Sequence, residues 1–252
     1  MFNLDCEFIL VKYMVSRQTF CVIRLSERVP TGIDGLDTLI EGGFPRGDVI
    51  LVAGGSGSGK TIFSTQFVYN GATRYGEKGV YATFEEDSKT LKRNMLRFGF
   101  DLEKLEKEGT IKVVDLETLK GGGLSANVEY ILGTLNEING KRLVIDSLTA
   151  FLSACTEKLE YRMLMHLIYR MLKTRSVTTI MTCSVPKGAK TLGLGIEEFI
   201  ADSLLFLENS IDNLELKTRF LIQKMRGTDH SRRYHNVIVT DKGLQIVPFT
   251  IT

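Results

Sequence analysis

One stretch decides how the rest of the chain must fold: Gly54-Gly55-Ser56-Gly57-Ser58-Gly59-Lys60-Thr61. It matches the G-x-x-x-x-G-K-[ST] phosphate-loop pattern at every position and follows an apolar run at residues 49–53, which predicts a buried parallel strand. Glycines let the main chain curl so that successive N–H groups face a phosphate chain, and a helix starting near Lys60 would add its positive end. The pattern predicts Lys60 at the β- and γ-phosphates of ATP and the Thr61 hydroxyl at Mg²⁺. The alternative is an ordinary Gly/Ser-rich turn.

Strand and helix signals alternate on both sides of this loop. Strand-like apolar runs occur at residues 80–84, 111–114, 143–147 and 178–183, and segments with helical spacing separate them. This alternation predicts an α/β fold with a mostly parallel central sheet, helices on both faces and ligands at the carboxyl ends of the strands. Beyond residue 203 the strand signals continue without long helices, which predicts antiparallel strands at the edge of the sheet.

Three local expectations concern helices. Residues 36–40 predict a short amphipathic helix, Ser88 is expected to cap the helix that follows it, and Leu167 is expected on the buried side of a helix at residues 164–172.

Composition narrows the classes of partner. The 252 residues suffice for one large domain, and 32 Lys and Arg against 30 Asp and Glu give a net charge of +2, so no strong field favours nucleic acid or an anionic membrane. No apolar run approaches the roughly 20 residues that span a bilayer, and a cytoplasmic protein without a membrane partner is expected. The cysteines lack metal-site or redox-pair spacing; they are Cys6, Cys21, Cys155 and Cys183.

Charged residues follow three of the expected strands. Asp146 ends a central strand, where a carboxylate could orient Mg²⁺, although buried strands also end in Asp for ordinary capping. Glu85 and Glu86 end another strand, where one of them could activate water, or both could simply favour the next helix N-terminus. Lys224 and Arg226, two residues apart in an extended segment, could clasp a phosphate or lie in a solvated turn.

Together these motifs resemble the KaiC-like branch of the RecA-superfamily ATPases over about residues 29–248. The resemblance rests on the phosphate loop and on six further motifs in order: Thr31-Gly32-Ile33-Asp34-Gly35-Leu36-Asp37, Gly42-Gly43-Phe44-Pro45, Thr83-Phe84-Glu85-Glu86, Ile145-Asp146-Ser147, Gly195-Ile196-Glu197-Glu198-Phe199 and Lys224-Met225-Arg226-Gly227-Thr228-Asp229-His230.

The resemblance implies a RecA-type P-loop core in one domain, residues 29–252, after an N-terminal extension at residues 1–28. It also implies a ring of six copies with ATP between subunits. Glu85 and Glu86 then resemble the catalytic glutamates and Asp146 the carboxylate associated with Mg²⁺. Lys224 and Arg226 would act in trans on the neighbour's γ-phosphate. The residues implied to approach the base and ribose of the neighbour's nucleotide are Met225, Thr228, His230 and Asp241.

Three functions remain open at this point. The first is a Mg²⁺-dependent ATPase that uses hydrolysis as a conformational or signalling switch; autokinase activity is not expected, because Glu198-Phe199 lack a hydroxyl at the positions where the family's clock protein has a Ser-Thr pair. The second is a recombinase-like ATPase that binds single-stranded DNA through Lys187 and Lys190, although no aromatic platform accompanies them. The third is a non-hydrolysing nucleotide-binding scaffold for an unknown protein partner.

Overall fold

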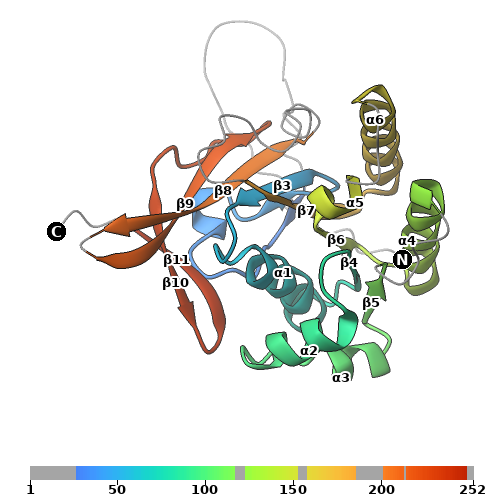
Figure 1. Ribbon diagram of the computed structural model, residues 1–252, viewed down its shortest axis with the longest axis horizontal. Coiled ribbons are helices and arrows are strands. Elements are labelled where there is room, and N and C mark those ends of the chain that lie inside the picture. Colours follow the sequence, from blue (N-terminus) through green and yellow to red (C-terminus); the bar gives the residue numbers. More distant parts are fainter. Residues whose placement is uncertain (1–26, 117–122, 153–157, 186–200, 213, 249–252) are drawn as a thin grey trace, which may run out of the picture.

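A nine-stranded mixed sheet runs through the centre of the protein (Figure 1). The structure is a computed structural model and describes residues 27–116, 123–152, 158–185, 201–212 and 214–248. Its strands are β1 (Arg28–Val29), β2 (Phe44–Pro45), β3 (Val49–Gly54), β4 (Gly79–Thr83), β5 (Ile111–Asp115), β6 (Arg142–Asp146), β7 (Thr178–Ser184), β8 (Ser203–Asp212), β9 (Glu215–Met225), β10 (His235–Thr240) and β11 (Gly243–Pro248). Its helices are the 3₁₀ turn η1 (Asp37–Leu39), α1 (Lys60–Tyr75), α2 (Ser88–Leu96), α3 (Leu102–Lys107), α4 (Gly123–Ile138), α5 (Leu148–Leu152) and α6 (Lys158–Arg175).

The order of the strands explains the apolar composition of β3. Across the sheet they lie in the order β11-β10-β9-β8-β3-β7-β6-β4-β5. Neighbours from β8 through β5 run parallel, whereas β9, β10 and β11 run antiparallel. Because β3 pairs with β7 on one side and β8 on the other, and helices cover both faces, every residue of β3 is buried. The predicted α/β fold with C-terminal antiparallel strands is confirmed, with β8 joining the parallel set.

Two separate cores cover the two faces of the sheet. Val144 of β6 packs with Phe63 and Phe67, which lie one turn apart on α1. The residues before and after it, Leu143 and Ile145, pack in the other core beneath α4 and α6. Helices α1 to α3 therefore lie on one face and α4 to α6 on the other, as Figure 1 shows. The carboxyl ends of the parallel strands all lie along one edge of the sheet, between the two helical layers. An edge of the sheet means such a row of strand ends, not an outermost strand.

The three local expectations about helices are wrong in detail. Only the 3₁₀ turn η1 forms near residues 36–40. Asp87, rather than Ser88, caps α2, since its Oδ1 accepts hydrogen bonds from the N–H groups of Lys89 and Thr90. Leu167 is 53% exposed, because the buried stripe of α6 runs through Met165, Ile168 and Leu172 and leaves Leu167 about 100° to the side.

Several expectations fall outside the described residues. They concern the segment at 1–26, the residues Cys155, Lys187 and Lys190, and the motif at residues 195–199. Within the part of the chain that the structure describes, no helix is both long and apolar enough to cross a membrane.

Candidate nucleotide site

The phosphate loop leaves β3 at the edge where the parallel strands end. Gly57 and Gly59 have φ angles of +71° and +91°, which side chains rarely allow, and a Cβ on Gly54 would lie 2.3 Å from the carbonyl oxygen of Leu207. Gly59 is also the N-cap of α1, and no side chain caps the helix there. The first N–H groups of this 16-residue helix therefore face the loop without a capping side chain, which favours an anion.

Lys60 brings the charges of the site together. Its Nζ donates to the carbonyl oxygens of Gly54 and Gly55 at 2.9 and 2.8 Å. Burial lowers the pKa of Lys60, while the negative charges of Asp146 and Glu85 oppose that shift. The loop lysine, the carboxylate that ends β6 and the first glutamate after β4 thus share one site, as the sequence predicted from three separate motifs.

Asp146 is held by two side chains that the sequence reasoning did not identify. Its Oδ2 accepts a hydrogen bond from the Tyr81 hydroxyl and its Oδ1 from Thr182 Oγ1, both at 2.5 Å. Tyr81 lies on β4 and Thr182 on β7, the two neighbours of β6. Burial, then the Asp146 charge, raise the pKa of Tyr81 well above its usual value, so this hydroxyl stays protonated and donating. A polar side chain within an apolar strand was the available signal.

The residues present fit a Mg²⁺ site that a nucleotide completes. Thr61 and Asp146 supply oxygen atoms of the kind that Mg²⁺ prefers, and Asp146 is only 8% exposed. Among the described residues, no group of three or more His, Cys, Asp or Glu side chains could hold a metal ion. Thr61 and Asp146 together match the usual Mg²⁺ site in nucleotide enzymes, where one or two carboxylates act with substrate phosphates and water.

The two glutamates after β4 have different surroundings. Glu85 is exposed, accepts a hydrogen bond from Ser147 Oγ, and contributes to the charge around Lys60. Glu86 turns toward α2, where its Oε1 accepts from Asn94 Nδ2 at 2.7 Å, and burial is the main cause of its raised pKa. Of the two glutamates, the one whose charge acts on Lys60 is therefore Glu85. Ser147, which the sequence reasoning did not single out, fixes it.

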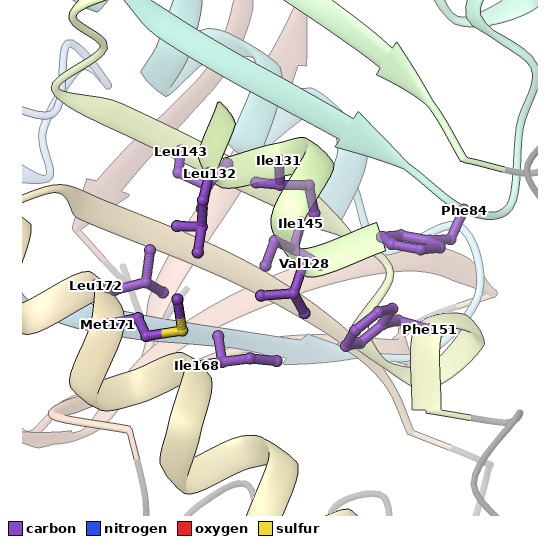
Figure 2. A pocket seen from close by; sticks show the side chains of 10 residues that line it. All are labelled: Phe84, Val128, Ile131, Leu132, Leu143, Ile145, Phe151, Ile168, Met171 and Leu172. Atoms are coloured by element: carbon purple, nitrogen blue, oxygen red, sulfur yellow. The ribbon is translucent and has the colours of Figure 1, made fainter. Parts of the chain in front are cut away.

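A purely apolar pocket lies behind these glutamates, between α4 and α6 (Figure 2). Phe84, the residue before Glu85, contacts Phe151 there with ring centroids 4.8 Å apart. The remaining space is about 10 Å³, room for at most one water molecule, and every lining side chain is apolar. The pocket is therefore an imperfection of the core that supports β4.

A β-bulge aims Lys224 and Arg226 away from the core. Leu204 pairs with Lys224 while Leu205 pairs with Ile222, so Gln223 is an extra residue on β9. Strict alternation would place residues 224 and 226 on the buried side with Ile222; instead Met225 takes that side and is 6% exposed. The Met225 side chain is buried in its own chain, and its approach to a neighbour's base stays a prediction.

The segment that follows, residues 224–230, is called the arm here, and it lies at the opposite edge of the sheet from the phosphate loop. Arg226 N donates to the carbonyl oxygen of Asp202, and Asp202 N donates to the carbonyl oxygen of Val49, the first residue of β3. Gly54 is the last residue of β3, and five steps of about 3.3 Å along the strand place it roughly 17 Å from Val49. The chain's own loop and arm therefore do not meet.

The remaining predicted contacts divide between the two regions. Thr228 belongs to the arm and accepts a hydrogen bond from Arg28 at 2.7 Å, and His230 lies 3.1 Å from the carbonyl oxygen of Ser231. Asp241 lies elsewhere, in the turn between β10 and β11, which lines a hollow with Arg97 and Phe98. Strand β11 packs against α1, so Asp241 accompanies the helix of the phosphate loop rather than the arm.

Known proteins match this arrangement over almost the whole described chain. A family model described as "ATPase: KaiC" matches residues 29–250. The chain is 36% identical over 234 residues to "Circadian clock protein KaiC3" of Synechocystis sp., a match that covers 89% of this chain and 46% of that protein. It is 34% identical over 236 residues to a "UPF0273 protein" of Thermotoga maritima, covering 88% and 96% of the two chains.

A solved structure agrees in fold as well. The "KaiC-like protein PH0186" of Pyrococcus horikoshii OT3 is 42% identical in sequence and has a TM-score of 0.82. The match covers 89% of this chain and 100% of that one. The chain thus spans about half the length of the Synechocystis protein and nearly all of the other two. It has the RecA-type fold and the phosphate loop of an ATP-binding ATPase domain, and it belongs to the KaiC ATPase family.

Proposed function

We propose that this protein hydrolyses ATP with Mg²⁺ at sites shared between neighbouring copies in a ring, with six copies as the resemblance implies. One observation carries the proposal. The phosphate loop and the arm lie at opposite edges of the same sheet. Lys224 and Arg226 therefore complete a nucleotide site only when another copy brings its loop to them. The family match supports the ATPase part of this statement.

Each residue has a task in such a site. The loop N–H groups and Lys60 bind the phosphates, and Lys60 exchanges its hydrogen bonds to Gly54 and Gly55 for phosphate oxygens. Glu85, fixed by Ser147, orients the attacking water and accepts its proton. Thr61 and Asp146 would hold Mg²⁺, whose charge would offset that of the phosphates. From the next copy, Arg226 and Lys224 stabilise the charge that develops on the γ-phosphate.

The hairpin β8–β9 could convert nucleotide occupancy into a signal. At one end Asn209 Nδ2 donates to the carbonyl oxygen of Ser56 in the phosphate loop, at 3.3 Å. At the other end β9 runs directly into the arm. A change of the loop on binding or hydrolysis therefore has a continuous hydrogen-bonded ladder to the residues presented to the next copy. This supports a conformational switch, with a protein partner as its receiver.

The test is ATP turnover per chain measured against protein concentration, with mass from light scattering on the same samples. We expect turnover to rise as the mass rises from one copy to the ring, and to stop when EDTA removes Mg²⁺. Constant turnover per chain in samples that remain single copies would contradict the shared site. No turnover at any mass would leave a nucleotide-binding scaffold as the function.

A further inference from the structure

We propose that Asp202 is a positioning residue that holds the arm in the direction needed to reach a neighbour's nucleotide. Asp202 directly precedes β8, is 5% exposed and belongs to no motif of the phosphate loop. The proposal rests on the shared site proposed above and adds a residue to it. Its basis is that Asp202 is fixed by its side chain and in turn fixes the arm.

Three donors fix the carboxylate of Asp202 from two elements. Its Oδ2 accepts from Val49 N at 2.9 Å and lies 2.8 Å from Lys173 Nζ, while its Oδ1 accepts from the Tyr169 hydroxyl at 2.9 Å. Val49 begins the central strand, and Tyr169 and Lys173 lie one turn apart on α6. Burial and the hydrogen bond to Asp202 raise the pKa of Tyr169, in that order, so Tyr169 remains a donor.

The same residue holds the arm through its main chain and its charge. Its carbonyl oxygen accepts from Arg226 N at 3.1 Å, and its Oδ1 lies 3.8 Å from the Arg226 guanidinium. The carbonyl oxygen of the preceding residue, Ala201, accepts from Lys224 Nζ at 2.7 Å. Residues 201 and 202 therefore hold both arm cations in place, directly after the bulge that turns these cations away from the core.

Stability alone does not account for these contacts. Burial raises the pKa of Asp48, which shares Lys173 at 2.7 Å, so keeping two carboxylates beside one lysine carries a desolvation cost. Apolar side chains of similar size often serve stability as well as a buried ion cluster does. What the cluster adds is direction, and errors near 1 Å in the placement of a group can cost about a hundredfold in rate.

The experiment compares Asp202→Asn with the matched variant Asp48→Asn. Because both variants remove one buried carboxylate charge beside Lys173, similar losses of thermal stability are expected. Of the two residues, only Asp202 touches the arm. We expect Asp202→Asn to lower kcat for ATP about five- to tenfold with KM unchanged, and Asp48→Asn to lower it less than about twofold. Equal losses of kcat in the two variants would overturn the proposal.

Mixed assemblies separate positioning from a defect in the chain's own site. A Lys60→Ala chain has an intact arm, so mixing it with Asp202→Asn should raise turnover per intact phosphate loop toward the native value, with mixing verified by mass. Rescue by Lys60→Ala of Arg226→Ala but not of Asp202→Asn would overturn the role of Asp202. Failure of the proposed shared site looks different, because Arg226→Ala would then not be rescued either.

Discussion

The two edges of the central sheet are built in different ways. At the phosphate-loop edge, parallel strands end together, and sequence-local motifs supply Lys60, Glu85 and Asp146. At the opposite edge, Lys224 and Arg226 lie at the end of an antiparallel strand and reach their orientation through a bulge, and Ala201 holds Lys224 while Asp202 holds Arg226. The first edge gathers the nucleotide-binding motifs within one chain, whereas under the proposed function the second acts on the nucleotide of another copy.

This difference predicts two groups of variants. Changes at the phosphate-loop edge damage the site that the chain itself holds, and changes at the arm damage the site of its neighbour. Two variants from different edges should rescue each other in mixed assemblies, because some interfaces then receive two intact halves. Two variants from the same edge should not.

The largest effect is expected from Lys60→Ala. Lys60 is the one cation placed by the loop itself, so its loss should abolish ATP binding and lower turnover by at least about a thousandfold. Fluorescent nucleotide titration and phosphate release measure the two quantities. Lys89→Ala, at an exposed lysine of α2, is the control and should leave both unchanged. Retained tight binding in Lys60→Ala would remove Lys60 from the site.

A smaller effect is expected from Glu85→Gln, which should keep ATP binding and lower kcat about a hundred- to ten-thousandfold. Glu86→Gln is the matched control and should stay within about threefold, because it alters only a hydrogen bond to Asn94. Single-turnover hydrolysis measures both. A reversed ranking would assign the base to Glu86. Glu85→Gln mixed with Lys60→Ala should stay inactive, since both belong to the same edge.

The smallest effect is expected from Ser147→Ala. It removes the hydrogen bond that orients Glu85 without removing the carboxylate, so kcat should fall up to about tenfold while KM for ATP stays constant. Ser210→Ala, at a hydroxyl of β8 outside the site, is the control. An unchanged kcat in Ser147→Ala would show that Glu85 is oriented without it.

The sequence predicted the phosphate-loop edge well because its signals are local. A strand, a glycine-rich turn and a helix start occupy consecutive residues, and Asp146 and Glu85 each end an apolar run. The parallel fold then brings these ends to one edge. The different surroundings of the two glutamates could not be predicted, because their hydrogen bonds to Ser147 and Asn94 span 62 and 8 residues of sequence.

The opposite edge was less predictable because pairing register determines it. Whether Lys224 and Arg226 face outward depends on the extra residue Gln223, which is defined only by the partners of β8. The role of Asp202 depends on Val49 and Lys173, far from it in sequence. The partners of Asp146, Tyr81 and Thr182, likewise require knowledge of which strands flank β6.

The central claim is that the site is divided between copies. Its most direct test mixes Arg226→Ala, which should bind ATP but not turn it over, with Lys60→Ala, which should do neither. In mixed assemblies verified by mass, turnover should reappear, because some interfaces pair the intact loop of the first variant with the intact arm of the second. Mixed assemblies that stay inactive would contradict the claim.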